Sequence, residues 1–160
     1  ASPGDVMELR SCMDYLTKHP QPSYLRLEKS SIYQIHKKKP KLSPGKWIKV
    51  WESSKKSKRK SIYLSTGAVI EFIEKKIKDK KYQPRSLYSL PLWGMKYKNN
   101  QERNIKKFYT IDVVEDHLND GGFQSWLKEC IYISKLCSKS LNKKVISQVG
   151  SKDYLMNFLK

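Results

Sequence analysis

The sequence predicts an α+β domain in which a small antiparallel sheet with a basic β-hairpin packs against three to four helices, in a winged-helix-like arrangement. Three observations predict this class. Apolar residues recur at helical spacing in several segments, short runs rich in β-branched and aromatic residues lie between them, and a lysine-rich segment joins two of these runs. The 160 residues are expected to form a single nucleic-acid-binding domain, 1–160, with a basic belt at 37–107 and a helical C-terminal part at 114–160.

The N-terminal part is predicted to hold one helix followed by short strands. Residues 5–18 predict a helix because their apolar side chains recur at helical spacing, and Pro20 and Pro22 end it. Segments 23–27 and 30–36 are expected to be short strands.

A basic β-hairpin is predicted next. Segments 46–52 and 61–65 are typical of strands, the loop before them contains a Pro44-Gly45 turn signal, and the connection 53–60 is rich in lysine. The two strands are therefore expected to pair with each other through a basic connection.

The remaining chain is predicted to be mainly helical. Thr66 is expected to cap a helix whose apolar side chains are Val69, Phe72, Ile73 and Ile77. A long loop is predicted at 83–105 and a strand at 106–114, followed by a turn at 120–122. Helices are expected at 123–141 and at 151–160, the second with Ser151 as its N-cap.

The net charge of +18 is concentrated in the middle of the chain. Residues 1–36 sum to zero and residues 108–160 to +1, whereas 37–81 contribute +12 and 82–107 contribute +5. Seventeen of the 18 excess charges therefore lie in the basic belt, residues 37–107. Such a concentration repels itself, and a polyanionic partner relieves that repulsion.

The basic belt predicts contact with nucleic acid, because ammonium and guanidinium groups spaced along a surface can follow a phosphate backbone. Lysine outnumbers arginine there, which favours backbone contact over base reading. The predicted contact residues are Lys37, Lys38, Lys39, Lys41, Lys46, Lys49, Lys55, Lys56, Lys58, Arg59, Lys60, Lys75, Lys78, Arg85, Asn99, Asn100 and Arg103. Other interpretations of the basic run are a solvated loop or a nuclear-import signal.

The expected function is therefore that of a non-enzymatic DNA- or chromatin-binding domain in the nucleus, with duplex DNA as the favoured partner and a role in transcription regulation. One alternative is an RNA-binding module in which Trp93 and Tyr97 stack on bases. Another is a module that docks an acidic protein partner, which predicts that Leu90, Leu92 and Trp93 are exposed. The aromatic side chains of Trp47, Trp51 and Tyr63 are expected to pack in the sheet.

No catalytic, cofactor or metal site is predicted. Asp112, Glu115 and Asp116 lie at the end of a predicted strand, where carboxylates could bind Mg²⁺ or could serve the N-terminus of a helix. Glu74 and Lys76 match only half of a nuclease motif. Cys12, Cys130 and Cys137 are expected to be free thiols, the last two on one face of a helix. No apolar run is long enough to span a membrane, and no signal peptide is recognised.

Overall fold

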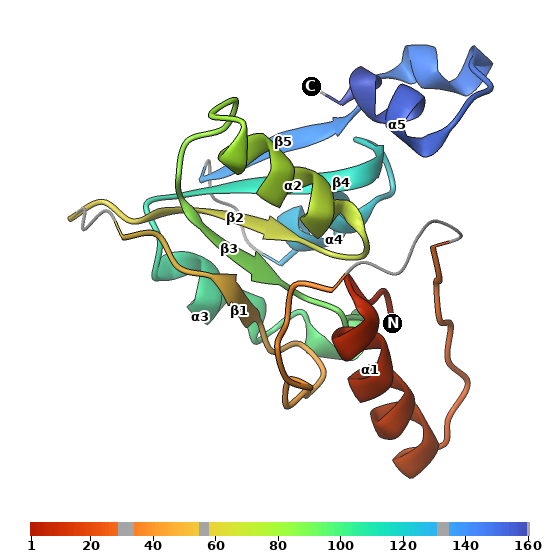
Figure 1. Cartoon of the computed structure of the whole chain (residues 1–160). Coiled ribbons are helices and arrows are strands. Elements are labelled where there is room, and N and C mark those ends of the chain that lie inside the picture. Colours follow the sequence, from red (N-terminus) through yellow and green to blue (C-terminus); the bar gives the residue numbers. More distant parts are fainter. Residues whose placement is uncertain (29–33, 55–57, 131–134, 160) are drawn as a thin grey trace.

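The computed structural model of the protein describes residues 1–28, 34–54, 58–130 and 135–159. It contains a five-stranded sheet with helices on both faces (Figure 1). The elements, in chain order, are α1 (Val6–Lys18), β1 (Ile48–Trp51), β2 (Ser61–Ser65), α2 (Val69–Lys78), β3 (Ser86–Ser89), the 3₁₀ helix η1 (Met95–Tyr97), α3 (Gln101–Lys106), β4 (Thr110–Leu118), α4 (Phe123–Lys128), β5 (Leu136–Leu141), η2 (Lys143–Ser147), α5 (Lys152–Leu155) and η3 (Met156–Phe158). No helix in the described part of the chain is long and apolar enough to cross a membrane.

The sheet is mixed and mostly parallel. Its strand order is β1-β3-β2-β4-β5, and only β1, at one edge, runs antiparallel to its neighbour. The protein is therefore an α/β protein, and the predicted α+β class with a small antiparallel sheet in a winged-helix-like arrangement is wrong. The physical reason is the connections: α2 joins β2 to β3 and α4 lies between β4 and β5, and helical crossovers of this kind bring successive strands into parallel alignment.

The predicted basic hairpin does not form. Strands β1 and β2 are not neighbours, because β3 lies between them and pairs with both. Residues 86–89, expected within the long loop 83–105, form this inserted strand. Residues 55–57 of the basic connection lie outside the described part of the chain.

The predicted helix at 5–18 is confirmed as α1, and Ser151 is confirmed as the N-cap of α5. Segment 23–27 is not a strand, and the segment predicted at 30–36 falls partly outside the described residues. Thr66 does not cap α2, which follows Ala68 and has no side-chain cap. The hydroxyl of Thr66 instead bonds to neighbours at the carboxyl end of the sheet, as described below.

The long helix predicted at 123–141 is wrong. Helix α4 ends at Lys128, and Leu136–Leu141 form strand β5, which pairs with β4. Cys130 and Cys137 therefore do not share a helix face. All three cysteines are free thiols, but only Cys12 lies in the core as expected of all three; Cys130 is half-buried and Cys137 is exposed. A helical spacing of apolar residues was present in this segment, but pairing with the long central strand β4 decides its conformation.

The core is divided by the sheet into two layers. Ile62 and Leu64 of β2 pack with side chains of α3 and α4, whereas Tyr63, between them, packs with Val69 and Ile73 of α2 on the other face. This alternation follows from the two-residue period of a strand. Two packed layers hold the carboxyl ends of the parallel strands in fixed positions, and the candidate site lies there.

Candidate functional site: a pocket at the switch point of the sheet

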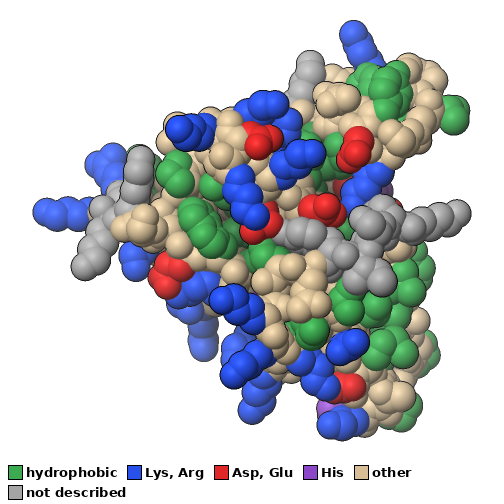
Figure 2. Space-filling view, viewed as in Figure 1, with side chains coloured by type: hydrophobic (Ala, Val, Ile, Leu, Met, Phe, Trp, Pro, Cys, Tyr) green, Lys and Arg blue, Asp and Glu red, His purple; other side chains and the backbone are tan. Residues whose placement is uncertain are grey.

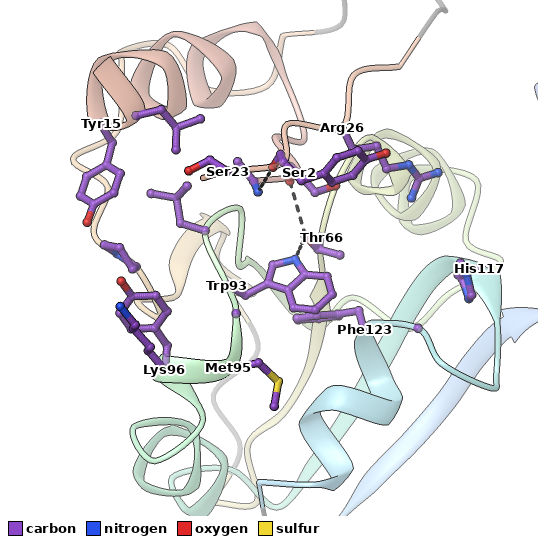
Figure 3. A pocket seen from close by; sticks show the side chains of 18 of the residues that line it. Ser2, Tyr15, Ser23, Arg26, Thr66, Trp93, Met95, Lys96, His117 and Phe123 are labelled. Atoms are coloured by element: carbon purple, nitrogen blue, oxygen red, sulfur yellow. Dashed lines mark hydrogen bonds between the residues drawn. The ribbon is translucent and has the colours of Figure 1, made fainter. Parts of the chain in front are cut away.

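The chain leaves the two central parallel strands in opposite directions. Strand β2 is followed by β3 on one side, and β4 is followed by β5 on the other. In open α/β sheets, ligands bind outside the carboxyl ends of strands at such a switch point. A cavity of about 610 Å³ lies here and is lined by Thr66 after β2, by residues 92–97 after β3 and by residues 115–117 of β4 (Figure 3). We call it the switch-point pocket; its other walls come from residues 1–2, the end of α1 and residues 21–26.

The floor of the switch-point pocket is aromatic. The ring centroids of Trp93 and Phe123 lie 5.3 Å apart, and Trp126 packs against both. Nε1 of Trp93 donates a hydrogen bond to the hydroxyl of Thr66 at 3.1 Å (Figure 3). That hydroxyl donates to the carbonyl of Leu90 at 3.0 Å. These bonds fix the ring of Trp93, so the floor is preformed and can accept an apolar or planar group.

One wall is formed by a buried carboxylate. Glu115 is 1% exposed, and its Oε2 accepts hydrogen bonds from the backbone N–H groups of Phe123 at 2.6 Å and Gln124 at 3.4 Å. Burial raises the pKa of Glu115 above its usual value, although these two bonds oppose the rise. A Cβ atom at Gly122 would lie 2.3 Å from the same Oε2, so the absence of a side chain at 122 allows this close approach.

A second wall is the segment that follows α1. Arg26 reaches Asp116 of β4 with two hydrogen bonds, of 3.0 and 2.8 Å. The Arg26 side chain is 43% exposed and that of Asp116 13% exposed, so the pair lies at the pocket rim rather than in the core. Next to it the exposed His117 places its Nδ1 3.0 Å from the carbonyl of Leu118.

The mouth of the pocket carries exposed apolar side chains. Tyr24 is 75% exposed and Met95 is 74% exposed, and both line the pocket. Leu27 and Met13, on the same N-terminal segments, are 57% and 47% exposed. In Figure 2, hydrophobic side chains gather along the side of the molecule that carries α1 and the segment after it, whereas lysine and arginine side chains dominate around β1. We call the surface formed by Tyr24 and Met95 at the mouth of the pocket the pocket face.

Asp112, Glu115 and Asp116, for which magnesium binding and a role at a helix N-terminus were the two interpretations, do not converge. Glu115 serves the start of α4, Asp116 pairs with Arg26, and Asp112 accepts a hydrogen bond of 3.0 Å from Arg85 on the opposite face of the sheet. Within the described residues no group of three metal-ligating side chains is present. The pocket presents hydroxyl groups and Lys96 around its aromatic floor.

The structure spreads the predicted nucleic-acid contacts over several elements. The segment between His36 and β1 carries Lys37, Lys38, Lys39 and Lys41; β1 and its start carry Lys46 and Lys49; the segment before β2 carries Lys58, Arg59 and Lys60; α2 carries Lys75 and Lys78; and α3 carries Arg103, preceded by Asn99 and Asn100. Three of these lysines form ion pairs with carboxylates: Lys39 with Asp14, Lys49 with Glu52, and Lys78 with Glu74. Lys55 and Lys56 lie outside the described residues. Arg85 is engaged by Asp112, and its guanidinium lies 5.8 Å from the ring centre of Tyr63.

The aromatic side chains expected in the sheet do pack there. Trp47 stacks on Phe108 at 5.9 Å, Trp51 packs against the α2 layer, and Tyr63 is 2% exposed. Leu90 and Leu92 are buried, so the exposure that the acidic-partner hypothesis required of them is wrong.

Most of the switch-point pocket was not predicted from the sequence. Much of its lining comes from within residues 1–26 and 115–123, which lie outside the basic belt, whereas Thr66 and residues 92–97 lie within the belt. A usable signal was present, because polar residues at 115–117 follow an apolar strand and precede a Gly121-Gly122 turn. This signal points to a site only if the strand is parallel to its neighbours.

Comparison with known proteins gives a fold but no family. No family model and no curated protein matches the sequence. Among solved structures, the chain resembles a split-gene transketolase described as an inactive β4 tetramer, with a TM-score of 0.76 and 14% sequence identity. The match covers 98% of this chain and 51% of that one, so the chain spans about half the length of its structural neighbour. At this identity the likeness shows a shared α/β fold.

Proposed function

We propose that this chain is a binding domain of a transketolase-type assembly. It has no catalytic activity on its own and becomes functional when it associates with a companion polypeptide through the pocket face. The observation that carries the proposal is the open pocket at the switch point, bordered by exposed apolar side chains. The fold supports it, since nearly the whole chain superposes on half of a split-gene transketolase chain.

The exposure of the pocket face favours association. Tyr24 and Met95 leave most of their side chains in water, although both lie at the mouth of a pocket with an aromatic floor. Burial of a large apolar side chain contributes about 1.5–3 kcal/mol. A partner that covers both residues would therefore gain a substantial part of its binding free energy there.

The charge distribution favours the N-terminal side of the pocket face. The basic belt contributes 17 of the 18 excess charges, whereas residues 1–36, which supply Tyr24, sum to zero; Met95 lies within the belt, beside Lys96. A second cationic chain is repelled less on the N-terminal side of the pocket face than along the belt.

The carboxylates beside the pocket are already engaged, which supports a binding role rather than a catalytic one. Glu115 holds the start of α4 and Asp116 holds Arg26, so neither carboxylate is left as a general base without breaking a structural contact. Reacting groups are proposed to come from the companion polypeptide.

The test is a transketolase assay of the chain alone and after mixing with the polypeptide that supplies the remaining half of a split transketolase. We expect no turnover from either part alone and turnover from the mixture. Turnover by this chain alone, or none from a mixture shown to form a complex, would contradict the proposal.

A second candidate function is nucleic-acid binding by the basic belt, as a DNA- or chromatin-binding domain in the nucleus. It is favoured by a specific observation: Lys37, Lys38, Lys46, Lys58 and Lys60 are all exposed. Fluorescence anisotropy with duplex DNA and single-stranded RNA at two salt concentrations tests it. Binding that falls steeply with salt and disappears on charge reversal of Lys58 and Lys60 supports this function, and binding unchanged by that reversal contradicts it.

A further inference from the structure

A buried group of two carboxylates and one imidazole lies at the start of α1, outside the lining of the switch-point pocket. Asp5 and Glu8 are at the N-terminus of α1, and His36 precedes the basic belt. Both carboxylate side chains are 0% exposed and the His36 side chain is 10% exposed. We call these three residues the carboxylate–histidine cluster; neither the proposed assembly nor nucleic-acid binding makes use of it.

Asp5 ties the segment around His36 to the start of α1. Its Oδ2 accepts hydrogen bonds from the backbone N–H groups of Ile35 at 3.0 Å and His36 at 2.8 Å, and lies 3.0 Å from Nδ1 of the His36 ring. Its Oδ1 accepts from the N–H of Glu8 at 2.8 Å and caps the helix. These bonds hold the pKa of Asp5 at about 2 in spite of its burial, so Asp5 remains ionised near neutral pH.

Glu8 and His36 face each other with unused hydrogen-bonding capacity. Oε2 of Glu8 accepts from the N–H of Gly4 at 2.7 Å and from the hydroxyl of Ser89 at 3.1 Å. Oε1 of Glu8 lies 4.0 Å from Nε2 of His36, and neither of these two buried atoms has a hydrogen-bond partner among the described residues. A proton held by Glu8 or His36 relieves the repulsion between the buried carboxylates of Asp5 and Glu8. When that proton is lost, both carboxylates are negatively charged and the imidazole of His36 is neutral.

The ionisation of the pair falls in the neutral range. Burial raises the pKa of Glu8 to about 7. Burial alone would lower the pKa of His36, but the hydrogen bond that its ring donates to Asp5 and the charge of Glu8 outweigh it and raise the pKa above the ordinary value. Cys12, on the next turn of α1, stays a thiol because burial and the charge of Glu8 raise its pKa to about 12. The charge of the Ala1 amino group lowers the pKa of Cys12 and so opposes this rise.

A short backbone relay connects the cluster to the pocket. Gly4, bonded to Glu8, packs so closely on Ile70 that an added Cβ would lie 2.5 Å from that side chain. Two residues earlier, the carbonyl of Ser2 accepts from the N–H of Gly67 at 2.9 Å, and its own N–H donates to the carbonyl of Pro91 at 2.8 Å. Ser2 lines the pocket beside Thr66, the acceptor of the Trp93 hydrogen bond (Figure 3).

We propose that the carboxylate–histidine cluster is a proton-operated clasp that fastens residues 35–36 to the start of α1 and holds residues 2–5, of which Ser2 lines the pocket. The clasp is closed while Glu8 and His36 hold one proton between them. It loosens when they lose that proton, because the repulsion between Glu8 and Asp5 then weakens the contacts to Gly4 and His36. The wall of the switch-point pocket formed by Ser2 is released with it. This proposal concerns the chain itself and stands whether or not the proposed assembly forms.

The test is hydrogen exchange of the Gly4 and His36 amides at pH 6 and pH 9, corrected for the intrinsic pH dependence of exchange. We expect protection of both amides to fall at least about tenfold from pH 6 to pH 9 in the wild-type chain. Glu8→Gln keeps an acceptor for Gly4 but cannot ionise, and should abolish the fall. His19→Gln, a change at an exposed histidine outside the cluster, should leave it intact.

Equal protection at the two pH values, or the same fall in Glu8→Gln, would overturn the proposal. If Glu8→Gln fails to fold, as judged by circular dichroism, an NMR titration of the wild-type histidine rings decides instead. A His36 ring that titrates above His19 and His117, with the amide shifts of Gly4 following it, supports the clasp. A His36 ring that titrates with the exposed histidines refutes it.

Discussion

Arg26 and Asp116, ninety residues apart in the sequence, form a two-point ion pair with distances of 3.0 and 2.8 Å. The pair fastens a segment with no helix or strand, residues 20–28, to the carboxyl end of the central strand β4. Hydrogen bonds of Ala1 with Tyr24 and Arg26 and an ion pair between Glu28 and Lys152 hold the same segment. The Arg26–Asp116 pair joins this wall of the switch-point pocket to β4 and can be probed by a single substitution.

Asp116→Asn should loosen this wall. Two charge-assisted bonds become neutral ones, and because Arg26 is partly exposed the free energy of unfolding should fall by about 1 kcal/mol or less. Proteolytic cleavage within residues 20–28 should accelerate more than global unfolding does. The matched control is Asp14→Asn, which breaks the exposed pair with Lys39 and should change neither quantity. Equal cleavage rates in the two variants would contradict this account of the wall.

Gly122→Ala should destabilise the site severely. The new methyl group would lie 2.3 Å from Oε2 of Glu115 and 3.0 Å from Nδ1 of His117, so the carboxylate must leave the start of α4. We expect a loss of about 2–3 kcal/mol in the free energy of unfolding, measured by urea denaturation. Gly94→Ala is the control, since nothing lies within 4 Å of its added Cβ, and it should stay within about 0.5 kcal/mol of wild type. Similar stabilities for the two variants would show that the close approach is not required.

Thr66→Val should disturb the pocket floor, whereas Thr66→Ser should not. Valine has the shape of threonine but leaves Nε1 of Trp93 without its acceptor and the carbonyl of Leu90 without its donor. The unpaired groups should cost about 1–3 kcal/mol and shift the tryptophan emission. Serine keeps the hydroxyl and should preserve the wild-type spectrum. A spectrum that responds equally to both changes would mean that the ring of Trp93 is not held by this bond.

The carboxylate–histidine cluster also predicts the sign of a pH effect on stability. The folded-state pKa of Glu8 is raised to about 7 and that of His36 is raised as well, so their stabilisation is full at acid pH and is lost as the pH rises through the neutral range. Asp5, with a pKa of about 2, adds stability that is lost only as the pH falls below its ordinary range. Urea denaturation from pH 5 to pH 9 should show wild type losing stability relative to Glu8→Gln. A constant difference between the two curves would contradict this prediction.

Sequence reasoning located the elements whose pattern is long or flanked by clear signals. Helix α1, strands β1, β2 and β4, and the cap at Ser151 were all found. It missed β3, because four residues, Ser86–Ser89, carry too little alternation to be distinguished from a loop. It also mistook β5 for a helix, since the apolar spacing there fits both periods and only pairing with β4 decides between them.

The missed strand is the reason that the site was missed. Without β3, strands β1 and β2 are expected to pair as a hairpin, and the lysine-rich connection between them is then expected to be the binding surface. With β3 inserted, β2, β3 and β4 become parallel and their carboxyl ends meet. Thr66, Trp93 and Glu115, far apart in sequence, then border one pocket. Local patterns cannot show such a convergence, because it depends on the order of strands in the sheet.

The most direct test of the central claim is sedimentation velocity of this chain mixed with the companion half of a split transketolase. Three forms are compared: wild type, a pocket-face variant with Tyr24→Ser and Met95→Ser, and a belt variant with Lys58→Glu and Lys60→Glu. We predict a complex with wild type and with the belt variant, and no complex with the pocket-face variant. A pocket-face variant that still binds, or a wild-type chain that sediments apart from the companion, would contradict the account.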